Sequence, residues 1–311
     1  MTTTSTHNGK IQMNEEEWRK HYHDVIFPLD LFELIPEEHL KHEESLPEVT
    51  LSAFTETGQA ESHILVPKQR SYIGRYPVIP SSLMNTRCTD LGAEGVLDKL
   101  NTTLSTAYTL DAPCLSSLLE DYITKDYNFG TAYACLRPIW YNNLTTVVKE
   151  KLRTHEIWDQ EMRQKVLIEN TIISTIMPPR RIWDLYSNRV VPWHFVHRKP
   201  CLISHVWMEE KDRKDVLMPI NGREWPVAIL KDANLDLICI EMLNIGTEYV
   251  WLDVLCLRQV DRQREDLRLE EWKVNVPTIG CVYQRTQVVC YFSGLGQPLA
   301  LSLKAGDFES D

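Results

Sequence analysis

Residues 249–259, Tyr-Val-Trp-Leu-Asp-Val-Leu-Cys-Leu-Arg-Gln, combine a run of aromatic and branched apolar side chains with one carboxylate and a polar end. An almost continuous apolar run is typical of a strand that is covered on both faces. Asp253 interrupts this run. Because an unpaired buried charge is very costly, we expect Asp253 either to find a structural partner or to lie at the strand's end, facing a crevice.

The residues on either side of this stretch predict a parallel sheet. An apolar segment at 201–207 precedes it, and a third strand is predicted at 288–292. Between the first two strands, Leu235, Ile238 and Met242 recur at helical spacing. A strand, a helix and a strand joined by connections of this length are typical of a right-handed crossover. We therefore expect a small α/β domain built on a parallel sheet.

The first half of the chain is predicted to be mostly helical. Residues 1–13 are polar and low in complexity, which indicates a disordered tail. Helices are predicted to begin at Asn14 and at Pro113, and a long helix is predicted over 144–175. We assign residues 14–177 to one mostly helical N-terminal region of unknown function.

A change of composition separates this region from the predicted α/β domain. Two prolines follow Met177, and the aromatic and strand-forming segments begin after them. Residues 178–311 are therefore assigned to the α/β domain. Within the N-terminal region, residues 46–111 are rich in Ser, Thr, Pro and Gly, with strand-like pieces at 64–66 and 72–79.

Bulk composition excludes several classes of protein. The 311 residues include 44 acidic and 33 basic side chains, a formal net charge of -11, which gives no electrostatic footprint for nucleic acid. No apolar run approaches the length of a transmembrane helix, and no signal peptide is apparent, so we predict a soluble cytoplasmic protein without a membrane span. The eight cysteines are dispersed without a Cys-x-x-Cys pair, which indicates reduced core residues and no metal site.

Three segments, in order, resemble conserved blocks of the fungal heterokaryon incompatibility (HET) domain. They are Leu-Ile-Ser-His-Val-Trp at 202–207, the opening stretch at 249–259, and a helix followed by a strand at 276–296. The middle block is the most specific. It matches the family spacing at Trp251, Asp253, Leu255, Cys256 and Gln259.

The sequence also departs from the HET pattern. His205 stands where the family usually has Tyr, and Met208 stands where it has Gly. Pro277 interrupts the helix that precedes Tyr283, and the chain reaches Asp311 without the family's later Arg-x-Trp-x-x-Gln-Glu segment. We therefore expect a HET-like domain that is partial at its C-terminus.

The resemblance implies a fold similar to the Toll/interleukin-receptor (TIR) domain. It also implies an intracellular signalling role in fungal non-self recognition and programmed cell death, through association with other proteins or with itself. The helical N-terminal region would then act as a regulator. No cofactor is implied.

A second hypothesis makes the chain an enzyme. Ligands of open parallel sheets bind outside the carboxyl ends of the strands, so one crevice is expected there. The predicted binding residues are Ser204, Trp207, Asp253, Cys256 and Gln259. Some TIR-like domains split NAD with a glutamate, and the resemblance therefore suggests an NAD glycohydrolase, with NAD as its substrate. The candidate catalytic residues are Glu241, Glu265, Glu270 and Glu271.

A purely structural interpretation of the same residues is also open. The tryptophans would be core residues, and Asp253 would cap a local turn or pair with Arg258 or Arg262. Nucleophilic catalysis by Ser204 with His205 is disfavoured, because adjacent strand residues point to opposite faces.

Overall fold

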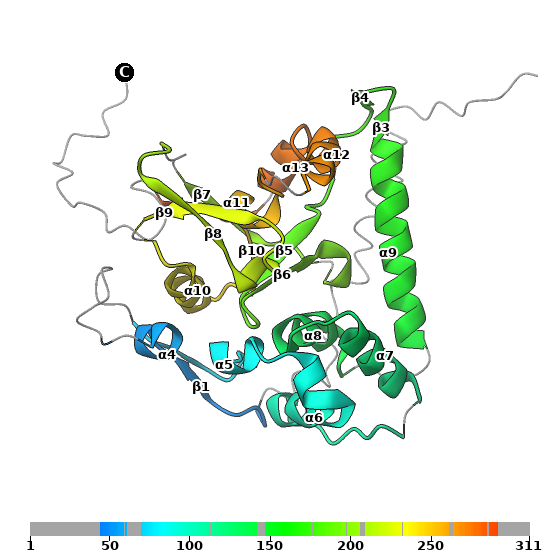
Figure 1. The fold of residues 1–311 in the computed structure, drawn as a ribbon, viewed down its shortest axis with the longest axis vertical. Helices are drawn as coiled ribbons and strands as arrows, with labels where there is room; N and C mark the ends of the chain where they lie inside the picture. Colours follow the sequence, from blue (N-terminus) through cyan, green and yellow to red (C-terminus); the bar gives the residue numbers. More distant parts are fainter. Residues whose placement is uncertain are drawn as a thin grey trace, which may run out of the picture.

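The computed structural model describes residues 44–58, 60, 70–111, 113–141, 147–175, 177–196, 198–205, 209–231, 233–260, 264–284 and 286–291. The N-terminal part of this chain is mainly helical (Figure 1). Its elements are β1 (Val49–Leu51), α4 (Ala53–Thr57), β2 (Tyr72–Gly74), α5 (Ser81–Met84), α6 (Cys88–Leu104), α7 (Pro113–Thr124), α8 (Phe129–Leu136), the 3-10 helix η2 (Arg137–Ile139) and α9 (Val147–Val166). The predicted tail at 1–13 and the predicted helix from Asn14 lie outside the described residues.

The C-terminal part contains most of the strands. After a small hairpin of β3 (Leu167–Ile168) and β4 (Thr171–Ile172) come β5 (Arg181–Asp184), β6 (Arg189–Pro192), η3 (Trp193–Phe195), β7 (Cys201–His205), β8 (Arg213–Leu217), η4 (Pro219–Asn221), β9 (Pro226–Leu230), α10 (Leu235–Asn244), β10 (Tyr249–Trp251), α11 (Asp253–Cys256), α12 (Glu265–Asn275), α13 (Ile279–Tyr283) and β11 (Val288–Tyr291). The chain is thus of the α/β class, with helices and strands mixed in one structure.

The main sheet has five strands in the order β11-β7-β10-β5-β6. The predicted strands β7, β10 and β11 lie side by side and parallel, as expected. The expectation of a purely parallel sheet is wrong, because β5 pairs antiparallel with both β10 and β6. A tight connection of four residues joins β5 to β6, and such a connection permits only an antiparallel pair.

Helices cover both faces of the parallel part of the sheet. Figure 1 shows α10 on one side of the strands and the pair α12 and α13 on the other. Trp251 of β10 makes an edge-to-face contact with Tyr283 of α13, with ring centroids 5.7 Å apart. α12 and α13 are separate helices because Pro277 lies between them, which agrees with the predicted interruption.

The long helix α9 is shorter than predicted at its C-terminal end. It ends at Val166, whereas the apolar spacing suggested a helix to residue 175. Glu169 and Asn170 both adopt positive φ, 50° and 63°, and form the turn between β3 and β4. Asp159 and Arg163, one helical turn apart on α9, form a buried ion pair.

The region at 46–111 also differs from its extended appearance in the sequence. β2 occupies the start of the predicted piece at 72–79, but the long helix α6 follows it. The other predicted piece, at 64–66, lies outside the described residues.

One continuous apolar core joins the two parts of the molecule. Side chains of α6, α7 and α8 belong to the same buried cluster as those of β5, β7 and β10. The predicted boundary at residue 178 therefore does not separate two independent cores within the described chain. No helix in the described segments combines the length and apolar character needed to cross a membrane.

Candidate functional site at the strand ends

The carboxyl ends of β7, β10 and β11 meet at one edge of the sheet, because these strands are parallel neighbours. Ser204 lies opposite Cys290, and His205 lies opposite Tyr291. Ser204 and His205 are adjacent in an extended strand and so point to opposite faces. The structure therefore agrees with the expectation that Ser204 and His205 do not act together as nucleophile and base.

Asp253 joins this edge through an unexpected partner. Its Oδ1 lies 2.8 Å from Nε2 of His205. The side chains are 14% and 3% exposed for Asp253 and His205, so the contact is largely shielded from water. Asp253 is the first residue of α11, and the same Oδ1 accepts the amide of Val254 at 2.7 Å. The carboxylate thus links the end of β7 to the helix that follows β10.

For Asp253 the structure shows structural partners and a position just after β10, and the expected crevice stays a prediction. Asp253 is a structural acceptor, and it lies just beyond a strand end. Its predicted partner Arg258 instead forms ion pairs with Glu224 and Glu271. Arg262 lies outside the described residues.

The other predicted binding residues take different positions. Gln259 donates from Nε2 to the carbonyl oxygens of Asp253 and Leu257, at 3.3 and 2.9 Å, and so closes the turn after α11. Cys256 is fully buried, and burial raises the pKa of its thiol to about 12. Ser204 is half-buried at the end of β7. Trp207 lies outside the described residues, so its expected meeting with Ser204 and Asp253 stays a prediction.

Three of the four candidate glutamates are engaged away from His205. Glu265 binds Arg268, and Glu270 binds Lys273. Glu271 forms two hydrogen bonds with Arg181, of 2.6 and 2.7 Å. Burial alone would raise the pKa of Glu271, but Arg181, Arg180 and Arg258 outweigh it and hold that pKa below its ordinary value.

Glu241, the fourth candidate, lies near the C-terminal end of α10, before the connection to the start of β10. It is exposed on α10. Burial raises the pKa of Tyr291 to about 12, and the charge of Glu241 acts in the same direction. Tyr291 is in turn the register partner of His205. Of the four glutamates, Glu241 is the one that forms no ion pair among the described residues, whereas Glu265, Glu270 and Glu271 are paired.

Comparison with known proteins does not assign this chain to a family. None of the family models, curated proteins or solved structures that were compared with the chain matches it. The functional argument therefore rests on the residues themselves.

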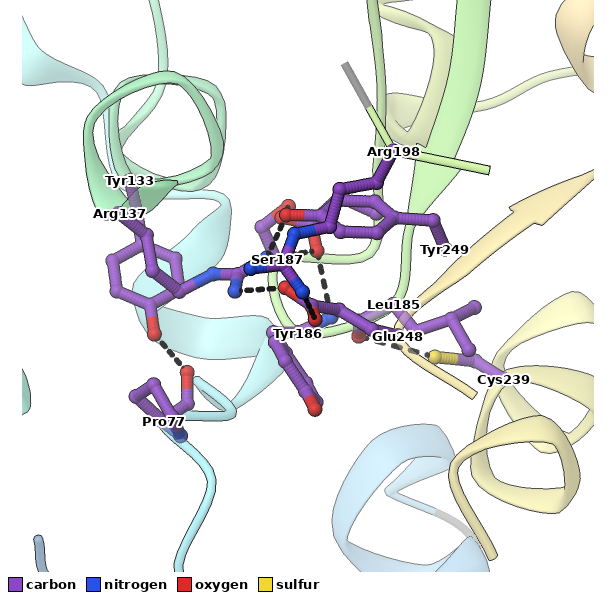
Figure 2. Close-up of polar contacts among 11 residues, drawn as sticks. Pro77, Tyr133, Arg137, Leu185, Tyr186, Ser187, Arg198, Cys239, Glu248 and Tyr249 are labelled. Atoms are coloured by element: carbon purple, nitrogen blue, oxygen red, sulfur yellow. Dashed lines mark hydrogen bonds and ion pairs between the residues drawn. The ribbon is translucent and has the colours of Figure 1, made fainter. Parts of the chain in front are cut away.

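A second polar cluster lies between the helical part and the sheet. Figure 2 shows Arg137, which extends from the end of α8 toward Glu248 and Tyr249. Its Nη2 donates to Oδ1 of Asp184 at 2.9 Å and to the hydroxyl of Tyr249 at 2.8 Å. Its Nη1 binds Glu248. One guanidinium from the helical part thus contacts residues at the facing ends of β5 and β10.

Aromatic rings pack against the guanidinium of this cluster, and burial and charge shift the pKa values of its carboxyl groups. The guanidinium carbon of Arg137 lies 4.5 Å from the ring centroid of Tyr186 and 5.4 Å from that of Tyr249. Burial raises the pKa of Asp184, although Arg137 and Ser187 act in the opposite direction. Burial would also raise the pKa of Glu248, but Arg137 and Arg198 outweigh it and lower that pKa. These contacts make Arg137 the main polar connection between the two parts.

The sequence did not predict that His205 is the partner of Asp253, and it did not point to Arg137 as a functional or structural residue. Arg137 follows the apolar run of α8, and an isolated cation beside such a run could have been noted as a buried charge in need of partners. In the sequence, His205 stands out as a departure from the HET pattern and as a disfavoured base for Ser204. Its pairing depends on the distance between two strand ends, which the sequence does not contain.

Proposed function

We propose that this chain is a HET-type signalling module that acts in the cytoplasm through protein association. The observation that carries the proposal is the position of the three HET-like blocks. They supply β7, β10 and β11, which lie together as neighbouring parallel strands. A TIR-like arrangement needs these segments in one sheet, with helices on both faces, and the fold supports that requirement.

Exposed apolar side chains support an associating surface on the same domain. An associating surface of this kind would be an apolar patch, because such patches mark interaction sites on proteins. The consecutive C-terminal elements α12, α13 and β11 and the turn between the helices each carry one such side chain. They are Leu269, Val276, Tyr283 and Val288, between 37% and 50% exposed.

Measurement of oligomeric state tests association directly. Light scattering on the purified protein over a range of concentrations should show a dimer or a larger assembly. Leu269→Lys places a charge on the exposed apolar surface, and it should shift the protein toward monomer. Ile157→Lys is the matched control, because Ile157 is 46% exposed on α9, in the other part of the chain. A wild-type protein that stays monomeric at every concentration would refute association.

The alternative is NAD hydrolysis at the strand ends. The specific observation that favours it is the shielded pair of His205 and Asp253 at the strand ends. In this alternative Glu241 is the catalytic residue, and the pair holds the end of β7 in place. A carboxylate near a water-shielded polar pair can stabilise the positive charge that develops as nicotinamide leaves.

Nicotinamide release from NAD separates the two functions. If the alternative holds, the wild-type protein should turn over NAD and Glu241→Gln should abolish turnover. Glu270→Gln is the matched control, since Glu270 is exposed and bound to Lys273. Absence of turnover in wild-type protein at high concentration would eliminate the enzyme and leave the signalling proposal intact.

A further inference from the structure

The segment that leads into β5 is held rigidly between two parts of the fold. Arg163 of α9 donates from Nη2 to the carbonyl oxygens of Pro178 and Pro179, at 3.4 and 3.2 Å. On the other side, the amide of Trp193 donates to the carbonyl oxygen of Arg180 at 3.0 Å. The backbone that carries the side chain of Arg180 is therefore fixed at both ends.

Arg163 and Arg181, two arginines beside the backbone of Arg180, each form an ion pair with a carboxylate. Arg163 forms two hydrogen bonds with Asp159, both of 2.9 Å, from Nε and Nη2. Arg181 binds Glu271 in the same two-point manner. In each of these two-point pairs, one guanidinium already balances the charge of one carboxylate.

Arg180 itself forms no ion pair in the described chain. Its Nε is buried and has no hydrogen-bond partner among the described residues. Burial lowers the pKa of Arg180 to about 10, and the positive charges of Arg163 and Arg181 act in the same direction. Asp159 and Glu271 act in the opposite direction, but both are already occupied. Arg258 also pairs with Glu271 and with Glu224, so four guanidinium groups share three carboxylates, which leaves an excess of one positive charge.

An excess positive charge beside a buried donor without a partner is stabilised when an anion binds there. Arginine does not deprotonate in proteins at physiological pH, so it cannot relieve its desolvation by losing its charge. A buried polar group without a partner needs an explanation such as an ion that binds there. Arg180 is only half-buried as a whole residue, so a ligand can reach it from solvent.

The geometry points to Arg180 as the anchor of a binding site for an oxyanion, a phosphate or carboxylate group, between α9, the segment before β5 and α12. The planar guanidinium would bind two oxygen atoms of such a group at once. Arg163 and Arg181 would contribute long-range attraction without breaking their own pairs. This site is separate from the strand-end cluster and does not depend on the proposed function.

Thermal unfolding with and without phosphate tests the site. The midpoint of wild-type protein should rise with inorganic phosphate, and the rise should saturate and exceed that in sodium chloride of equal ionic strength. A parallel series in acetate distinguishes a carboxylate from a phosphate as the preferred group. For Arg180→Gln, the apparent affinity for the anion should fall about tenfold or more, because a charge-assisted hydrogen bond is lost.

The anion-free midpoint separates binding from a structural role. Without added anion, Arg180→Gln should unfold at the same temperature as wild type or higher, because an uncompensated charge is removed. Arg213→Gln, which alters a half-exposed arginine on β8, should keep the wild-type response to phosphate. Equal responses to phosphate, acetate and chloride in wild type would overturn the inference, and so would a full phosphate response in Arg180→Gln.

If Arg180→Gln does not fold, Arg180→Lys tests the same site. Arg180→Lys keeps the positive charge and replaces the planar fork with a single ammonium group. We expect weaker binding of the anion with little change in the anion-free midpoint. Unchanged affinity in Arg180→Lys would rule out recognition by the guanidinium.

Discussion

Buried charge is the feature of single residues that most constrains this molecule. Arg137 is 9% exposed at its side chain, and its partner Asp184 is completely buried. The gain from such a pair is offset by the loss of hydration, so the pair is weak proof of stability. Loss of one partner is different, because it leaves the other charge buried and alone.

Substitution of Arg137 tests this reasoning. We predict that Arg137→Met lowers the free energy of unfolding by about 3–5 kcal/mol, since Asp184 would stay buried without its partner. Urea denaturation followed by tryptophan fluorescence gives the value. Lys165→Met removes the exposed pair with Glu161, and its effect should stay within about 0.5 kcal/mol. Equal effects of the two substitutions would show that the buried network contributes no more than a surface pair.

At the scale of elements, the sequence predicted segments with a clear period and missed those without one. β7, β10, β11, α7 and α10 form where apolar spacing indicated them. α8 was missed because all of its residues except Thr131 are buried, so it shows no polar face. α6 was missed because Gly92, with φ of 67°, interrupts its helical geometry.

Element ends and polar contacts were harder to predict than element types. α9 was extended too far because residues 167–172 continue its apolar spacing, although they form a hairpin. At the candidate site, the prediction that Asp253 needs a partner is confirmed by its contact with His205. The identity of that partner, His205, follows only from the pairing of β7 with β10.

The contact between α4 and α10 supplies a prediction about pH. A small cavity between these helices is lined by Glu56 and Asp236, among other residues. Glu56 accepts a hydrogen bond from the hydroxyl of Ser81. Burial raises the pKa of Glu56, and the charge of Asp236 raises it further. A carboxyl with a raised pKa in the folded state loses stability as the pH rises from its ordinary pKa through the raised value.

Glu56→Gln should therefore be at least as stable as wild type near pH 7.5, because the amide stays neutral and can still accept the serine hydroxyl. This advantage should shrink as the pH falls to about 4, where Glu56 is protonated in both states. Thermal unfolding over this pH range measures it. Glu120→Gln is the control, since Glu120 is an exposed glutamate that also accepts a serine hydroxyl. A stability difference that stays constant from pH 4 to 7.5 would contradict the account.

At the scale of the whole molecule, the two parts are connected from both sides. Arg137 reaches from the helical part to β5 and β10, and Arg189 of β6 reaches back to the carbonyl oxygen of Met84 at 2.9 Å. Together with the continuous core, these contacts join the helical part to the five-stranded sheet. In the proposed function, regulation by the N-terminal region would act through this interface.

Survival of a fungal host after induced expression of the full chain tests the central claim most directly. We predict that wild-type protein and Ile157→Lys both reduce the number of surviving colonies, whereas Leu269→Lys, expressed to the same level, does not. That pattern would connect cell death to the exposed apolar side chain of Leu269 on α12. Unchanged survival with wild-type protein, or equal killing by Leu269→Lys, would contradict a signalling module that acts by association.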